Sequence, residues 1–158
     1  TGLIGPISDY VLETACTQTK HWMDASCQQL SVSVNISARQ FQQHRLTKSV
    51  RQALRKSCLP AHCLDLELTE STLMNESDAV IPVLNEFREL GVRISVDDFG
   101  TGYSSLSFLK RFPVNAVKID RSFVTDITTN PDDAAIAGAV VAMAAAHAYR
   151  HRCSWPGH

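Results

Sequence analysis

The sequence is poor in the features that mark several large classes of protein. It contains no run approaching the ~20 apolar residues of a membrane span, and aromatic residues make up only 7% of its 158 positions. Lysine and arginine together number 15, against 16 aspartates and glutamates, so no basic excess points to a polyanion. We therefore expect no membrane segment in this chain and no direct DNA binding.

Paired or metal-bound cysteines are not indicated either. The five cysteines are odd in number, include no CxxC and have spacings that suit no zinc module. Reduced thiols in a cytoplasmic protein are the simplest interpretation. A metal site at His147 and His151 is conceivable, but the stretch lacks the glutamate of HExxH, so we interpret both as solvated helix residues.

The length fits a single globular domain. Apolar residues make up 44% of the chain and charged residues 20%, with no Pro/Gly/Ser-rich linker, so a core of ordinary size is expected. The chain opens at Thr1 with neither methionine nor a signal-peptide pattern, and we expect it to be part of a longer protein.

Hydrophobic patterning predicts four strands separated by helices. The predicted strands cover residues 30–37, 64–70, 93–97 and 116–120. The predicted helices cover 6–22, 46–57, 78–90, a short segment through Leu109 and a last one from Pro131. Strand starts about 23–33 residues apart, with a helix in each interval, are typical of repeated βα units and a parallel sheet.

Each predicted strand has one apolar and one polar face. Leu64, Leu66 and Leu68 alternate with Asp65 and Glu67, and the other three strands follow the same pattern. A parallel sheet covered by helices on both sides should be apolar on both faces. A curved sheet, as in a barrel, would instead gather the polar faces at one interior. An open sheet with one wetted face is the alternative.

The polar residues also gather toward one end of the strands. Asn35, Glu67, Asp97 and Asp120 each lie at or near the C-terminal end of a predicted strand. In α/β barrels the chemistry sits at that end. Because isolated buried charge is costly, carboxylates gathered in this way usually have a metal ion, a lysine or water between them.

Four motifs on these strands resemble the EAL domain, a family of bacterial cyclic-di-GMP phosphodiesterases. They are Ser33–Ser37 (SVNIS), Glu67–Ser71 (ELTES), Asp97–Leu106 (DDFGTGYSSL) and Val117–Val124 (VKIDRSFV). The resemblance covers residues 1–143 and leaves 144–158 as a divergent tail. It implies an α/β fold, a partial TIM-like (βα) barrel of about four βα units with parallel strands and the helices outside.

The resemblance also implies roles for individual residues. Asn35, Glu67 and Asp97 match metal ligands, and Asp98 matches a ligand of a second metal. The metals are Mg²⁺ or Mn²⁺, which prefer such hard oxygen donors. The remaining matches are Lys118 near the attacking water, Asp120 beside the metals, Glu70 as the anchor of the DDFGTG loop and a support of dimerisation, and Phe99, Gly100, Thr101 and Gly102 in that loop.

Departures from the family pattern set the functional expectation. The Glu-Ala-Leu motif and the general-base glutamate of the family have no counterpart in this sequence, which suggests a truncated domain with impaired or absent hydrolysis. The alternatives are a non-enzymatic cyclic-di-GMP-binding module and an interaction module that only dimerises. We also expect a homodimer in the bacterial cytoplasm.

Overall fold

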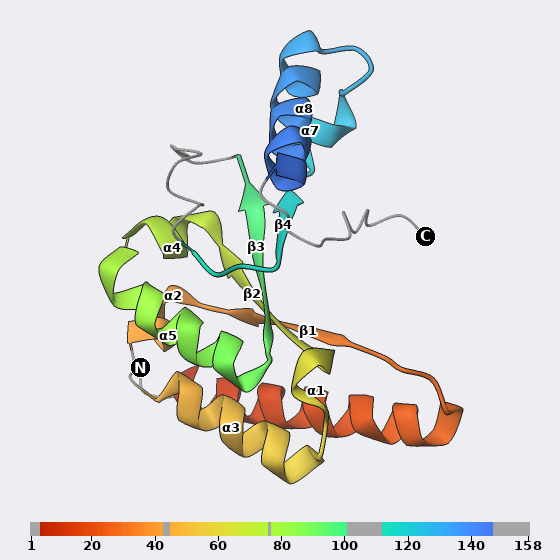
Figure 1. The fold of residues 1–158 in the computed structure, drawn as a ribbon, viewed down its shortest axis with the longest axis vertical. Coiled ribbons are helices and arrows are strands. Elements are labelled where there is room, and N and C mark those ends of the chain that lie inside the picture. Colours follow the sequence, from red (N-terminus) through yellow and green to blue (C-terminus); the bar gives the residue numbers. More distant parts are fainter. Residues whose placement is uncertain (1–3, 43–44, 76, 101–111, 147–158) are drawn as a thin grey trace.

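A four-stranded parallel sheet organises the computed structural model, which describes residues 4–42, 45–75, 77–100 and 112–146. The strands are β1 (Val32–Ile36), β2 (Leu64–Thr69), β3 (Arg93–Phe99) and β4 (Ala116–Ile119). Their order in the sheet is β1-β2-β3-β4, all parallel (Figure 1). The predicted βα succession is confirmed, and in the described part of the chain β1 and β4 form the sheet edges.

The long predicted helices are present. They are α1 (Ile4–Ser26), α3 (Leu46–Ser57), α5 (Ser77–Leu90) and α8 (Pro131–Ala146). Four short elements were not predicted, because segments of three to six residues are too short to show a helical period: α2 (Ala38–Gln42), η1 (Ala61–Cys63), α4 (Glu70–Asn75) and α7 (Ser122–Thr125). The short helix expected through Leu109 lies outside the described residues. Of the helices the structure describes, none is both long and apolar enough to cross a membrane.

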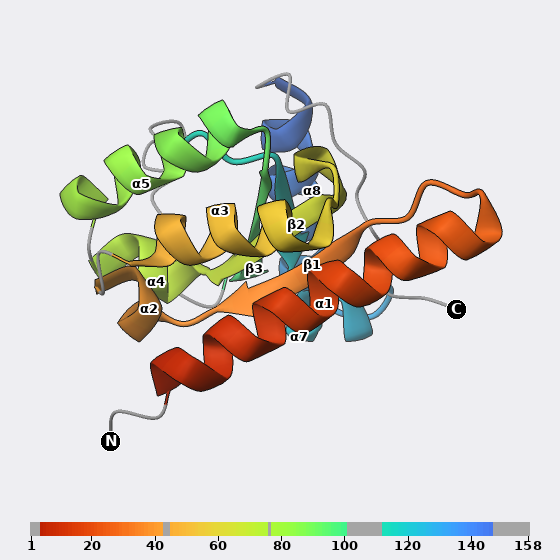
Figure 2. The same cartoon turned by 90° about the horizontal axis from the view of Figure 1, so that it is seen from below.

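The core lies between the apolar face of the sheet and helices α1, α3 and α5 (Figures 1 and 2). Leu64, Leu66 and Leu68 of β2 are at most 1% exposed and pack in one cluster with residues of all three helices. The helical members of the cluster include Leu12, Cys16, Val50, Ala53, Leu84 and Phe87. Burial of each large side chain contributes about 1.5–3 kcal/mol, so this cluster fixes which face of the sheet remains for polar residues.

The turn into β3 depends on a glycine. After α5 ends, Gly91 adopts a φ of 80°, a left-handed conformation that residues other than glycine rarely adopt. Its N–H donates to the Arg88 carbonyl at 3.0 Å, and the Val92 N–H donates to the Phe87 carbonyl at 3.0 Å. This pair of bonds closes the helix C-terminus and directs the chain into the sheet.

Candidate functional site at the strand ends

The polar face forms rows that cross the sheet. Asn35 of β1 is paired with Glu67 of β2, and Glu67 is paired with Ser95 of β3. Asn35 is exposed, whereas Glu67 is 6% exposed and Ser95 only 1%. The polar face predicted from the alternation is therefore real, and toward the middle of the sheet it is buried.

A lysine accompanies the buried Glu67. The Lys118 Nζ of β4 lies 2.5 Å from Glu67 Oε1 of β2, with 30% of the lysine side chain exposed and 7% of the glutamate. Neighbouring strands lie about 4.8 Å apart, so the lysine side chain spans β3 to reach its partner. The small Ser95 side chain on β3 leaves room for this crossing. The carboxylate and ammonium compensate one another, which makes burial of Glu67 tolerable.

A bulge turns both adjacent aspartates away from the core. Val96 pairs with Val117 and Phe99 pairs with Ile119, so Asp97 and Asp98 together face the single residue Lys118. Asp98 has a φ of 55°, a left-handed conformation that aspartate adopts more readily than most residues. Regular alternation would put the two aspartates on opposite faces. With the bulge, Val96 and Phe99 are both buried and neither aspartate is.

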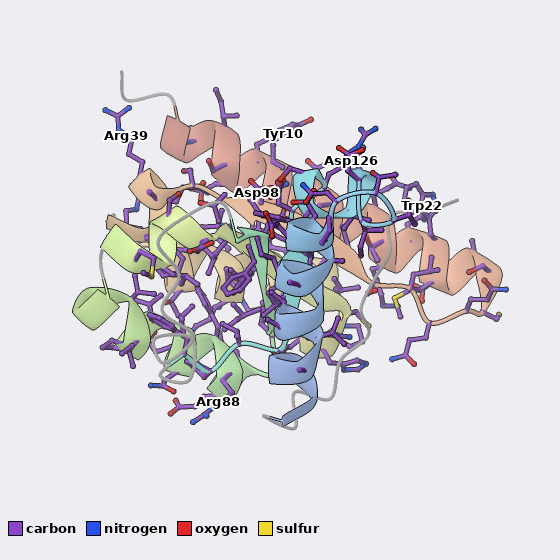
Figure 3. All side chains as sticks on the ribbon, turned by 90° about the horizontal axis from the view of Figure 1, so that it is seen from above. Tyr10, Trp22, Arg39, Arg88, Asp98 and Asp126 are labelled. Carbon is purple, nitrogen blue, oxygen red and sulfur yellow. The ribbon has the colours of Figure 1, made fainter. Side chains whose placement is uncertain are left out.

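The carboxylates at this end influence one another. Partial desolvation, followed by the negative charges of Asp97 and Asp120, raises the pKa of Asp98 (labelled in Figure 3). Hydrogen bonds from the hydroxyl and the N–H of Ser122 hold the pKa of Asp120 below its usual value. Three carboxylates thus lie close enough to repel, an arrangement that a cation would relieve.

Glu70 and Phe123 both contact Gly100, the residue directly after β3. Glu70 is 4% exposed, and its Oε2 accepts the Gly100 N–H at 2.9 Å. Gly100 has a φ of 105°, and a Cβ there would lie 2.8 Å from Cε2 of Phe123. Any other residue at this position would be strained. The other loop residues of the prediction, Thr101 and Gly102, lie outside the described residues.

The donor set suits a hard divalent cation but is not a finished cage. Asn35, Glu67, Asp97, Asp98 and Asp120 offer only oxygen donors, the chemistry that Mg²⁺ and Mn²⁺ prefer. Across residues 4–42, 45–75, 77–100 and 112–146, however, no three His, Cys, Asp or Glu side chains are gathered as a metal-holding group. Lys118 moreover holds Glu67. A cation would therefore have to replace the lysine as the partner of Glu67.

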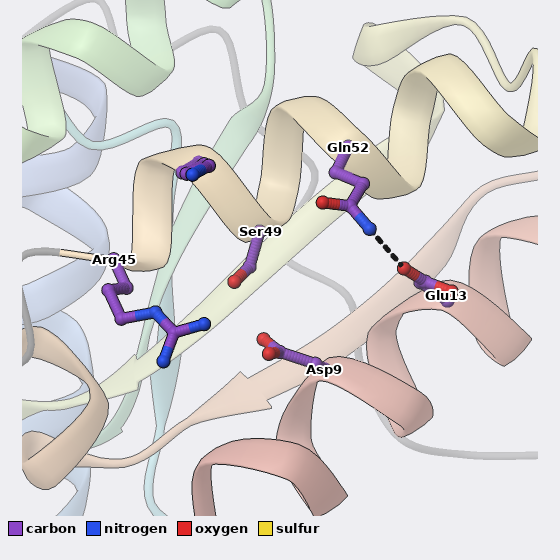
Figure 4. A pocket seen from close by; sticks show the side chains of 6 residues that line it. Asp9, Glu13, Arg45, Ser49 and Gln52 are labelled. Atoms are coloured by element: carbon purple, nitrogen blue, oxygen red, sulfur yellow. Dashed lines mark hydrogen bonds between the residues drawn. The ribbon is translucent and has the colours of Figure 1, made fainter.

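Two clefts of the described surface lie away from this end, along α1 and the start of α3. One of about 180 Å³ is lined by charged and polar side chains that include Asp9, Glu13, Arg45 and Gln52 (Figure 4). Glu13 binds Lys56 Nζ at 2.8 and 3.0 Å, and that lysine holds the pKa of Glu13 below its usual value. Glu13 is thus already engaged by Lys56 and Gln52, and the cleft shares no lining residue with the strand-end site.

Comparison with known proteins identifies the family. The model of the EAL domain matches residues 1–150. The chain belongs to the EAL domain family. Signaling protein YkoW of Bacillus subtilis is 48% identical over 143 residues, covering 90% of this chain and 18% of YkoW. The bifunctional diguanylate cyclase/cyclic di-GMP phosphodiesterase MucR of Pseudomonas aeruginosa is 48% identical over 144 residues, covering 90% of this chain and 21% of MucR.

Solved EAL structures share the fold. A c-di-GMP complex of the PaMucR phosphodiesterase superposes with a TM-score of 0.87 at 45% identity, covering 92% of this chain and 59% of that one. The EAL domain of DcpA from Mycobacterium smegmatis gives 0.82 at 36% identity, covering 90% and 65%. The chain thus spans about a fifth of the curated relatives and less than two thirds of these solved chains. What the whole relatives do can be transferred to this EAL chain only as a proposal.

Three parts of the site were not predicted from the sequence. Phe123 sits against Gly100, Ser122 donates to Asp120, and Ser95 donates to Asp65. An Asp-x-Ser spacing does signal a local side-chain cap at Asp120. No sequence pattern signals the other two contacts, because each joins residues more than 20 positions apart.

Proposed function

We propose that this EAL chain binds cyclic-di-GMP together with divalent cations on the polar face of its sheet. The observation that carries the proposal is the convergence of Glu67, Lys118 and the bulged pair Asp97–Asp98 at the strand ends. The 45% identical PaMucR structure, a c-di-GMP complex, supports it. A phosphodiester carries negative charge, and the carboxylates alone would repel it. Bound cations, together with the positive charge of Lys118, would make the site attractive to the negatively charged phosphodiester.

In this proposal each residue has a role that follows from its position at the strand ends. Asn35, Glu67, Asp97 and Asp98 would hold Mg²⁺ or Mn²⁺, with Asp120 beside them and Lys118 directed at the phosphodiester and its attacking water. When bound, such ions stabilise charge on the oxygens of a phosphodiester and acidify a water. The hydrogen bond from the Gly100 N–H to Glu70 would fix the direction in which the chain leaves β3.

Turnover by the 158-residue chain alone is proposed to be slow. The family resemblance places the general base on a glutamate that this sequence does not contain. Loss of a positioned base removes roughly 10²–10⁴ in rate.

The proposed location is the reducing cytoplasm of a bacterium, where the four described cysteines would stay free thiols.

Calorimetry and product analysis test the proposal together. Cyclic-di-GMP is titrated into the chain in EDTA and then in Mg²⁺, and chromatography follows the appearance of linear pGpG. We expect binding that Mg²⁺ strengthens and Asp97→Asn weakens, with little pGpG. Asp24→Asn, an exposed aspartate on α1, is the matched control and should bind like the wild type. Absence of binding in both conditions would refute the proposal.

A dimerisation module is the second candidate, favoured by the exposed apolar surface. Within the described residues both sheet edges, β1 and β4, have a strand neighbour on one side only. The outer face of α1 exposes Ile7, Tyr10, Val11 and Trp22 by 48–70%, and Figure 3 shows Tyr10 and Trp22 on this helix. Open strand edges and apolar patches favour association, and we propose a homodimer that covers them.

A further inference from the structure

A residue just outside the sheet binds both backbone polar groups of one β3 residue. The N–H of Asn115, which directly precedes β4, donates to the Ile94 carbonyl at 2.7 Å. The Ile94 N–H in turn donates to the side-chain Oδ1 of Asn115 at 2.9 Å. Ile94 is fully buried, so its polar groups need partners within the protein. Asn115 supplies one partner with its backbone and the other with its side chain.

The chain directly before Asn115 offers β3 no N–H of its own. Pro113 has none to donate, and the Val114 N–H turns back to the Phe112 carbonyl at 2.9 Å. From Pro113 onward, the N–H of Asn115 is therefore the first that reaches β3. The contact with Ile94 marks the point at which β4 becomes aligned with its neighbour.

The ladder between β3 and β4 beyond this contact is short. Ser95 pairs with Ala116 and Val96 pairs with Val117, and the bulge follows directly. β4 is four residues long and, within the described part of the chain, has a strand on one side only (Figure 1). Two regular pairs before a bulge are a small number to determine where Lys118 lies, so a further contact at the start of the strand matters.

The position of Lys118 depends on the register of β4. Val117 packs against the core, whereas Lys118 meets Glu67 on the polar face, so a slip by one residue would turn the lysine toward the core. A slip by two residues keeps both faces in place, and alternation alone does not oppose it. That slip would carry Lys118 about 6–7 Å along the sheet, away from Glu67. The side-chain bond of Asn115 opposes both slips, because it ties one particular residue to β3.

We propose that Asn115 is a positioning residue for the strand-end site: its two hydrogen bonds to Ile94 fix the register of β4 on β3 and so place Lys118 where its ammonium reaches Glu67. Asn115 acts through the backbone of β4, since three positions along the chain separate it from Lys118. The inference rests on the proposed function only for what Lys118 does to a ligand, and the register itself involves no ligand.

Three substitutions isolate the side-chain bond. Asn115→Ala removes Oδ1 and leaves the backbone bond to Ile94. Asn115→Asp keeps an acceptor oxygen in the same position and should behave like the wild type. Asn130→Ala is the matched control, because Asn130 Oδ1 accepts the Asp132 N–H at 3.0 Å, a bond of the same kind at the start of α8.

Amine labelling of the full chain measures whether Lys118 keeps its place. An acylating reagent is applied under native conditions, and peptide mass spectrometry compares the modification of Lys118 with that of the exposed Lys48. We expect Asn115→Ala to raise the relative rate at Lys118 by roughly two- to fivefold, the range of a partly exposed ion pair. Asn115→Asp and Asn130→Ala should leave this rate unchanged, and an equal rise in the Asn130 control would overturn the inference.

Hydrogen exchange of the backbone amides separates positioning from local stabilisation. In Asn115→Ala the Ile94 amide should exchange roughly two- to tenfold faster, the range of one net hydrogen bond. Faster exchange at Ile94 with unchanged labelling of Lys118 would refute the positioning role. If the alanine variant does not fold, Asn115→Ser, whose shorter side chain ends farther from Ile94, takes its place with the same expectation. Neither readout uses cyclic-di-GMP or a metal, so a chain that binds neither would refute the proposed function alone.

Discussion

Replacement of Glu70 by alanine should destabilise the fold out of proportion to the small number of atoms removed. Glu70 is 4% exposed, and its carboxylate accepts the N–H of Gly100 at 2.9 Å. This hydrogen bond connects the C-terminal ends of β2 and β3. A hydrogen bond to a charged group contributes about 1.5–3 kcal/mol. We therefore expect Glu70→Ala to lower the free energy of unfolding by about 2 kcal/mol. Glu70→Gln keeps an acceptor oxygen and should cost about 1 kcal/mol.

Urea denaturation followed by circular dichroism measures both variants. For a chain of this size the alanine variant should also melt about 4–8 °C lower, at about 2–4 °C per kcal/mol. Glu89→Ala is the control, because Glu89 lies exposed on α5 and its removal should change stability by less than about 0.5 kcal/mol. The reasoning is refuted if Glu70→Ala unfolds at the same urea concentration as this control.

Further predictions concern the loop, acid stability, thiol reactivity and assembly. Gly100→Ala should lower the melting temperature, because its Cβ would meet Phe123 at 2.8 Å in a backbone conformation with φ of 105°; an unchanged melting temperature would contradict this contact. The hydroxyl and N–H of Ser122 lower the pKa of Asp120, so that carboxylate stabilises the fold above its unfolded-state pKa and loses the effect as the pH falls. Ser122→Ala should accordingly be less stable than the wild type at pH 7 in urea titrations and equal to it in acid. Burial raises the pKa of the Cys16 thiol to about 11, so native protein at pH 8 should protect it from DTNB while the exposed thiols react, as peptide mapping can show. Light scattering at micromolar concentration should give twice the chain mass of 17.4 kDa, and a monomer that persists on dilution would argue against the dimer.

The sequence was sufficient for the architecture because the strands and the helices α1, α3 and α5 each show a regular hydrophobic period. Apolar and polar residues alternate along β2, and the four strands lie in chain order as the βα pattern predicts. The polar face and its strand-end carboxylates followed from the same alternation. The family motifs then suggested which of these residues bind metal or take part in catalysis, but they did not give the distances between them.

The details that alternation could not supply are those made by departures from it. The bulge at Asp97 and Asp98 adds a residue to β3, and only the pairing with β4 reveals it. The Glu67–Lys118 pair joins strands that are not neighbours, through a side chain that crosses β3. Such contacts depend on sheet geometry and side-chain length, and neither is written in a local pattern.

Anomalous diffraction at the manganese edge, from crystals grown with Mn²⁺ and cyclic-di-GMP, tests the central claim most directly. The claim is that the carboxylates at the strand ends hold divalent cations on which the phosphodiester rests. We predict an anomalous peak in contact with Glu67 and Asp97, with Lys118 moved off Glu67 and a phosphate oxygen at the metal. Crystals that contain the dinucleotide elsewhere, or that show Lys118 still paired with Glu67 and no manganese at these aspartates, would contradict it.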